Sequence, residues 1–179
     1  ALGEWTEEGN ATPELFSPGE LSHSADVFPI EFWDMQQARR VLHGDDPFAD
    51  VHIDEEHSGP ELERELKIKF LFLRRKYVGL VGQPEHLAAL MLASVTTFLV
   101  LLRAGLRLYN GAAPGAGDSL PESPDDVPVD KLQALDLLGQ RLKLDFSAIR
   151  QVAEARTGEL PAEPEKIEAL FAKYLSNIE

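Results

Sequence analysis

The sequence contains no cysteine, so disulfides and thiolate metal sites are excluded. Cationic residues are also scarce: 17 Lys and Arg stand against 31 Asp and Glu, which gives a formal net charge of −14. A field of this sign repels nucleic acid, so we expect no nucleic-acid partner. The glycine-rich residues 111–117 lack the Lys-Ser/Thr ending of a P-loop, and no Gly-x-Ser-x-Gly elbow occurs.

Long apolar runs and targeting signals are absent as well. The longest stretch without a charged residue or histidine, 87–102, is interrupted by Ser94, Thr96 and Thr97. A membrane-spanning helix needs about 20 apolar residues, so we interpret this stretch as the central helix of a bundle and expect no membrane partner. The first residues lack the basic-then-apolar pattern of a secretory signal, and we expect a cytoplasmic protein.

Helical periodicity dominates the second part of the chain. The clearest stripe has apolar residues every three or four positions: Leu62, Leu66, Phe70, Leu73 and Tyr77. Gly79 and Gly82 are expected to end this helix. Four further helices are predicted at residues 84–109, 129–142, 146–157 and 163–178. Helices joined mostly by short turns predict a mainly α fold, with a bundle of about five helices.

The N-terminal part has a different pattern. Residues 27–33 are apolar and β-prone, which predicts one strand, and a short amphipathic helix is expected at 35–42. Asp34 is interpreted as the cap of that helix. We therefore expect a short α+β segment over residues 1–58 and the helical bundle over 59–179. A flexible linker is predicted at about 111–128 because this stretch is small, Pro-rich and acidic.

Residues 27–48, VFPIEFWDMQQARRVLHGDDPF, give the strongest hint of function. Their order of strand, helix and HGDDP turn resembles the last part of the catalytic core in polymerase-beta-type nucleotidyltransferases, and the helical tail beginning ELERELKIKF resembles it more loosely. The Gly-Ser turn and Asp-x-Asp strand of that family do not occur in residues 1–26. Because the sequence also starts without methionine, we interpret it as the C-terminal portion of such an enzyme, or as a relative without the catalytic half.

The resemblance implies roles for particular residues. Glu31 matches the third carboxylate of the family's metal-binding acidic set. Arg39 and Arg40 would support that site or contact a nucleotide, and Arg64 and Lys67 would reach a triphosphate. One acid cannot hold the two magnesium ions of nucleotidyl transfer, so we predict no metal site and no cofactor for this chain alone. Magnesium and a nucleoside triphosphate are expected only if the missing catalytic half is supplied.

Each of these residues also has a structural explanation. Glu31 could be a solvent-facing acid of an edge strand, or it could pair with a base of the 62–110 region. Arg39 and Arg40 could lie on a solvated helix face beside Asp45 and Asp46. The region 62–110 has 8 bases and 3 acids, whereas residues 1–61 have 15 acids and 2 bases. Its positive charge could neutralise the acidic N-terminal segment or meet a phosphate-bearing ligand.

Two functions are therefore compatible with the sequence. The first is the C-terminal helical portion of a nucleotidyltransferase-like protein, inactive on its own. The alternative is a non-enzymatic helical module for protein interaction or regulation. In either case we expect a homodimer, because an edge strand at residues 27–33 would be covered by a second copy. The interface is expected at residues 27–35 or along the long second helix.

Overall fold

The computed structural model describes residue 7 and residues 13–53, 58–112, 127–158, 160–161 and 163–179. In this part of the chain the fold is helical and contains no strand. Seven helices lie within the described ranges from residue 13 onward: α2 (Pro18–Val27), α3 (Pro29–Ala38), α4 (Ser58–Leu80), α5 (Pro84–Ala112), α6 (Lys131–Leu142), α7 (Ser147–Glu154) and α8 (Pro164–Ile178). The mainly α prediction is confirmed, and α4 to α8 overlap the five predicted helical ranges.

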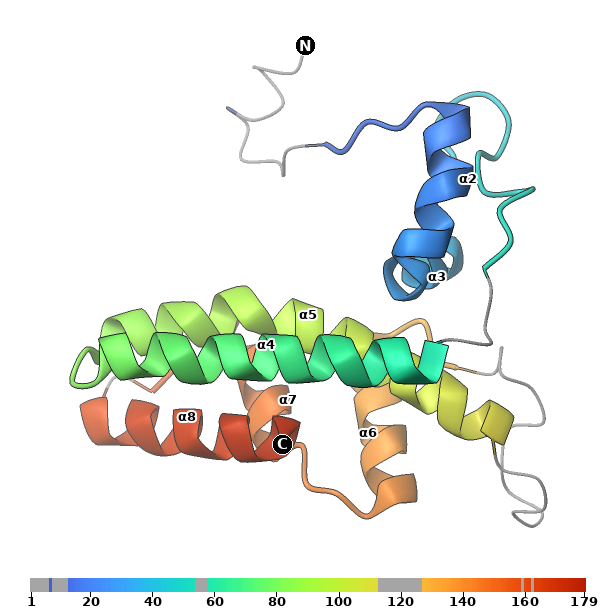
Figure 1. Ribbon diagram of the computed structural model, residues 1–179. Coiled ribbons are helices and arrows are strands. Elements are labelled where there is room, and N and C mark those ends of the chain that lie inside the picture. The colour runs from blue at the N-terminus through green and yellow to red at the C-terminus, as the bar shows by residue number, and fades with distance from the viewer. Residues whose placement is uncertain (1–6, 8–12, 54–57, 113–126, 159, 162) are drawn as a thin grey trace.

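Helix α5 is the central element of the bundle. It packs against α4, α6, α7 and α8, and α3 contacts the part of it near its C-terminal end. Helices α4 and α8 run alongside it, while α6 crosses at a steep angle (Figure 1). Buried α5 residues of the main core share one side of the helix: Leu87, Met91, Val95, Phe98, Leu99 and Leu106. Burial of such side chains contributes about 1.5–3 kcal/mol each.

The hairpin of α4 and α5 follows from the apolar stripe of α4. Leu62 and Leu73 are buried, and Leu66 and Tyr77 pack against the main core. The helix ends at Leu80, and Gly82 in the turn has φ +75°, a conformation that glycine adopts without steric cost. The predicted helix end is correct, and four of the five stripe residues pack inward, whereas Phe70 borders a surface hollow.

The predicted strand at residues 27–33 is wrong, since these residues end α2 and begin α3. Ser17 and Glu20 form a capping box that starts α2, with Ser17 accepting from the Glu20 amide. Pro29 occupies the first turn of α3, where a missing N–H carries no penalty. Neighbouring apolar residues of α3 pack against different helices: Phe32 packs on α2, and Ile30 packs on α4 and α5.

Two other boundaries differ from the expectation. Helix α3 ends at Ala38, so residues 39–42 of the predicted short helix are not helical. Helix α5 continues to Ala112, into the range where the linker was predicted. Most of that linker, residues 113–126, lies outside the described residues.

Helix α5 is long and apolar enough to cross a membrane, and it is the one such helix among the described residues. However, five other described helices contact it, and it carries the fully buried Arg103. A helix that is apolar on most sides is also typical of the core of a helical bundle. We therefore retain the interpretation of α5 as the central core helix.

Candidate functional site

Glu31 lies in the first turn of α3 and is exposed. It makes no hydrogen bond or ion pair with another residue that the structure describes. An acid at this position is favoured by the helix dipole, so its presence here needs no ligand. Within the described ranges, no three His, Asp or Glu side chains are grouped closely enough to hold a metal ion.

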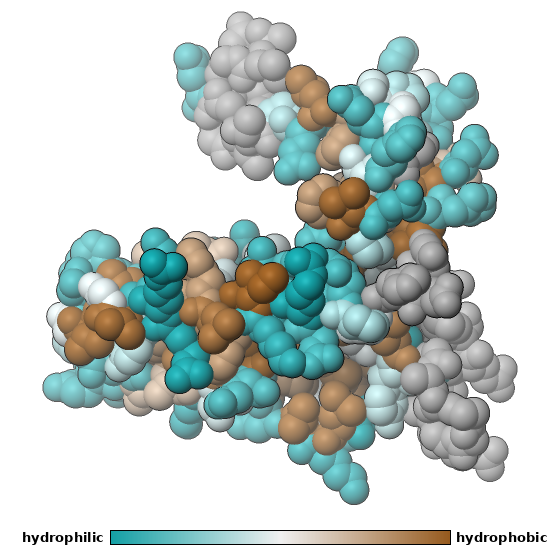
Figure 2. Space-filling view, viewed as in Figure 1, coloured by the Kyte–Doolittle hydropathy of each residue, from teal (hydrophilic) through white to brown (hydrophobic). Residues whose placement is uncertain are grey.

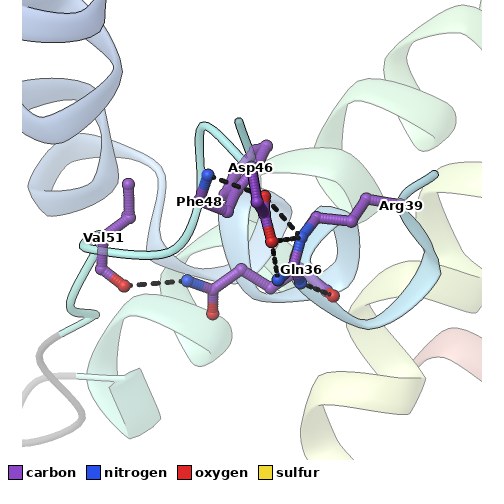
Figure 3. A network of polar contacts seen from close by, with 5 residues as sticks. All are labelled: Gln36, Arg39, Asp46, Phe48 and Val51. Carbon is purple, nitrogen blue, oxygen red and sulfur yellow. Dashed lines mark hydrogen bonds and ion pairs between the residues drawn. The ribbon is translucent and has the colours of Figure 1, made fainter. Parts of the chain in front are cut away.

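Arg39 follows α3 and closes the HGDDP turn (Figure 3). Its Nε donates to both carboxylate oxygens of Asp46 at 3.0 Å, and its Nη2 lies 2.5 Å from Asp46 Oδ2. Asp46 Oδ1 also accepts from the Phe48 amide at 3.0 Å, and the Arg39 guanidinium lies 5.7 Å from the centre of the Phe48 ring. The positive charge of Arg39 is therefore paired with the Asp46 carboxylate within the turn.

A second contact ties this segment to α3. The Gln36 side-chain amide donates to the Val51 carbonyl at 2.8 Å (Figure 3), and Val51 is buried against Phe32. The neighbouring Arg40 stays exposed and has no polar partner among the described residues. Arg39 and Arg40 were both predicted to contact a nucleotide. Within the described residues, only Arg40 has a guanidinium without a polar partner.

The electrostatics of the turn predict a response to acid. The hydrogen bonds from Arg39 and from the Phe48 amide lower the pKa of Asp46 below its ordinary value of 3.8. A carboxylate whose pKa is lowered on folding stabilises the fold above its unfolded pKa. That contribution is lost as the pH falls through the lowered pKa, so we expect the turn to open only in strong acid.

An NMR titration of the Phe48 amide checks this expectation. In the natural sequence its chemical shift should stay constant from neutral pH down to the ordinary aspartate range and move only below it. Asp46→Asn removes the titrating group and should flatten this transition. A Phe48 transition at or above the ordinary aspartate pKa would show that the pair with Arg39 does not hold in solution.

Arg64 and Lys67 lie on the exposed side of α4 and are paired within that helix. Arg64 binds Glu61 and lies 3.4 Å from Glu65, and Lys67 binds Glu63. The Glu61 hydrogen bond raises the pKa of Arg64. Such exposed pairs are weak and exchange easily, so they do not exclude a ligand.

The predicted nucleotide-binding residues do not share one depression. Lys67 borders a surface hollow of about 420 Å³ between α4 and the end of α8, together with Phe70 and Ile178. Glu31, Arg39 and Arg40 do not line this hollow. Their arrangement in the described chain therefore gives no triphosphate pocket, and their role in nucleotide binding stays a prediction.

A buried ionic centre that sequence analysis missed joins α3, α5 and α6. The Arg103 side chain is 0% exposed, and its Nη1 lies 2.6 Å from Asp34 Oδ1. Lys131, at the start of α6, lies 3.0 Å from Asp34 Oδ2. Asp34 thus lies inside α3 and binds both cations, so its interpretation as a helix cap was wrong.

The surroundings of Arg103 explain how a charge can lie in the core. Its Nε donates to the Pro128 carbonyl at 2.9 Å, and its guanidinium lies 4.7 Å from the centre of the Trp33 ring. Arg107, one helical turn further along α5, lies 5.0 Å from the same ring. Pairing, hydrogen bonding and stacking together offset part of the cost of desolvating the guanidinium, whose Nη2 has no hydrogen-bond partner among the described residues.

The outer face of α4 carries several exposed apolar residues. We use this name for Ile68, Leu71, Phe72 and Val78, which are 45%, 60%, 51% and 77% exposed. Figure 2 shows hydrophobic and strongly hydrophilic patches side by side along this helix. A groove of about 330 Å³ runs beside it, between Ile68 and Phe72 of α4 and Ala93 and Thr97 of α5.

Comparison with known proteins gives no further information about the function of this chain. The sequence matches no protein-family model, and neither a curated protein nor a solved structure is significantly similar to it. The function must therefore be inferred from the geometry and from the residues themselves.

Proposed function

We propose that this chain is a helical protein-interaction module and that the outer face of α4 is its binding surface. The observation that carries the proposal is the spacing of the exposed apolar residues. Ile68, Leu71, Phe72 and Val78 recur at helical intervals on the side of α4 that faces away from the core. Single exposed apolar residues are common, but a row of four on one helix is typical of a contact surface.

The neighbouring groove and charges add to this support. Ala93 and Thr97 are small and exposed, so a side chain from a partner can enter beside Phe72. In the second half of α4, Arg74, Arg75 and Lys76 make no ion pair with any residue described. Arg74 and Lys76 lie over the rings of Phe70 and Phe72, at 5.5 Å and 5.3 Å from the ring centres, and their charge is not neutralised there. An apolar row with cations that lack an acidic partner at its end suits an amphipathic helix that carries acidic groups.

A model peptide tests this proposal directly. An amphipathic helix of leucine and glutamate, labelled with a fluorophore, should bind the natural protein and raise the fluorescence anisotropy. Phe72→Ser should weaken binding by about tenfold or more, as expected for a central apolar anchor. The matched variant Leu144→Ser, at another exposed leucine, should bind like the natural protein. Equal binding by all three proteins would contradict the assignment of this face.

We also propose a wider role, in which the module is the C-terminal helical portion of a nucleotidyltransferase-like protein. Residues 27–33 form no strand, so the resemblance now rests on Glu31 and the HGDDP turn alone. Exposed apolar residues flank α3 on both sides. Val27 and Phe28 precede its first turn and are 60% and 53% exposed, and Val41 and Leu42 follow its end at 41% and 81%. A separate catalytic unit that covered them would lie next to the exposed Glu31.

We expect the chain alone to be catalytically silent with magnesium and nucleoside triphosphates. Two-metal nucleotidyl transfer needs several carboxylates around the metals, and Glu31 has no acidic neighbours of that kind in the described ranges. Incubation with labelled triphosphates, followed by chromatography, should show no transfer product. Turnover that disappears in Glu31→Gln would overturn this expectation.

A further inference from the structure

We propose that the outer face of α4 binds the same face of a second copy, with the two helices antiparallel around a twofold axis. This inference rests on the proposed interaction function and identifies the partner. It moves the expected homodimer interface away from residues 27–35, which form no edge strand, and away from α5, which other helices cover. A twofold axis is the commonest symmetry of homodimers.

The charges of α4 are distributed in a self-complementary way. Its first part carries Glu61, Glu63 and Glu65, with Arg64 as the one base up to position 65. Residues 66–80 contain five bases and no acid: Lys67, Lys69, Arg74, Arg75 and Lys76. In an antiparallel pair the acidic start of each helix meets the basic end of the other, whereas a parallel pair would place like charges together.

A seven-residue spacing suggests the register. Glu61, Ile68 and Arg75 are seven residues apart, so they lie on nearly the same side of the helix. An axis at Ile68 places Ile68 against Ile68 of the partner subunit and Glu61 against Arg75 of the partner subunit. Arg75 has no ion pair within the described part of its own chain, whereas Glu61 pairs with Arg64 in its own helix and exchanges that weak, exposed pair for this contact.

Two further apolar residues flank the axis and face the first part of α4 in the partner subunit. Leu71 lies next to Ile68 on the outer face and is 60% exposed, and Phe72 borders the groove with α5. The residues from 61 to 78 extend over about 27 Å of helix, which gives a small interface. Interfaces below about 1,200 Å² are typical of weak and transient complexes, so we expect a dissociation constant in the micromolar range.

Sedimentation equilibrium on charge-reversal variants tests the pairing. Glu61→Lys or Arg75→Glu alone should weaken the dimer by about tenfold, because each places like charges opposite each other. The double variant should recover most of the natural affinity, since the opposite charges face each other again. Glu168→Lys, at an exposed acid on α8, is the control and should leave the affinity unchanged.

The absence of cysteine allows an independent test of the register. Ile68→Cys provides one thiol per chain, and a short bis-maleimide should join two copies rapidly if this position lies on the axis. A cysteine at the exposed Leu144 should react far more slowly between chains. A monomer at all concentrations, or no recovery in the double variant, would overturn the antiparallel dimer. If the model peptide still bound through Phe72, the interaction function would stand without the dimer, and loss of both would remove both proposals.

Discussion

Asp34→Ala is expected to lower the free energy of unfolding by about 3–5 kcal/mol, because it leaves a buried arginine without its carboxylate. Arg103 is completely inaccessible to solvent, and Asp34 is its one ionic partner in the described structure. The remaining contacts of the guanidinium, with the Pro128 carbonyl and the Trp33 ring, do not neutralise the charge. The loss should therefore far exceed that of an ordinary surface pair.

Urea unfolding monitored by circular dichroism measures this effect. Asp136→Ala is the matched control, because Asp136 also pairs with an arginine, Arg150, but at the surface. Double-mutant cycles on exposed pairs give about 1 kcal/mol or less, and we expect the control to stay within this range. Similar losses for the two variants would show that Arg103 reaches solvent when Asp34 is removed.

Arg103→Met provides a second comparison. It keeps an unbranched apolar stem beside Trp33 and removes the buried charge, while Asp34 retains the partly exposed Lys131 as a partner. Removing the buried cation is therefore expected to be less damaging than removing its carboxylate. The order Asp34→Ala worse than Arg103→Met follows from the different exposure of the two charges.

Much of the bundle could be predicted from sequence because its helices have one apolar side. The stripe from Leu62 to Tyr77 gives both the helix and its buried side, and the uncharged run before Arg103 identifies the central helix. The same reasoning predicted the wrong secondary structure for residues 27–33, and the reason is physical. Helix α3 packs on α2 with one side and on α5 with another. Its apolar residues are therefore close together in the sequence, in a pattern that is also typical of a strand.

The ionic pairs were less predictable than the helices. Asp34 and Arg103 are 69 positions apart, and no local pattern indicates that they meet. The one available signal was an arginine directly after 16 uncharged residues, on a helix expected to be central. Arg39 and Arg64 were candidates because of the family resemblance. The structural alternative that placed Arg39 beside Asp46 agrees with the structure, whereas the pair of Arg64 with Glu61 was not predicted.

The two phenylalanines beside the groove between α4 and α5 should respond very differently to truncation. Phe98 is 1% exposed and makes an edge-to-face contact with Tyr174, with ring centres 6.0 Å apart. Tyr174 is itself fully buried and shares a hydrogen bond of 3.0 Å with Ser94. Phe98→Ala therefore opens a cavity in the main core, and we expect a loss of about 3–5 kcal/mol in the free energy of unfolding.

Phe72→Ala is the matched control for this substitution. Phe72 borders the same groove but is 51% exposed, so its removal should change the free energy of unfolding by less than about 0.5 kcal/mol. Both variants should be unfolded in urea at a protein concentration below the dimer dissociation constant, because binding of a second copy stabilises the native state. Since Phe72 contributes to the proposed contact and Phe98 to the core, Phe72→Ala should weaken self-association without loss of stability. Equal destabilisation by the two variants would show that Phe72 belongs to the core, and the outer face of α4 would lose its central apolar anchor.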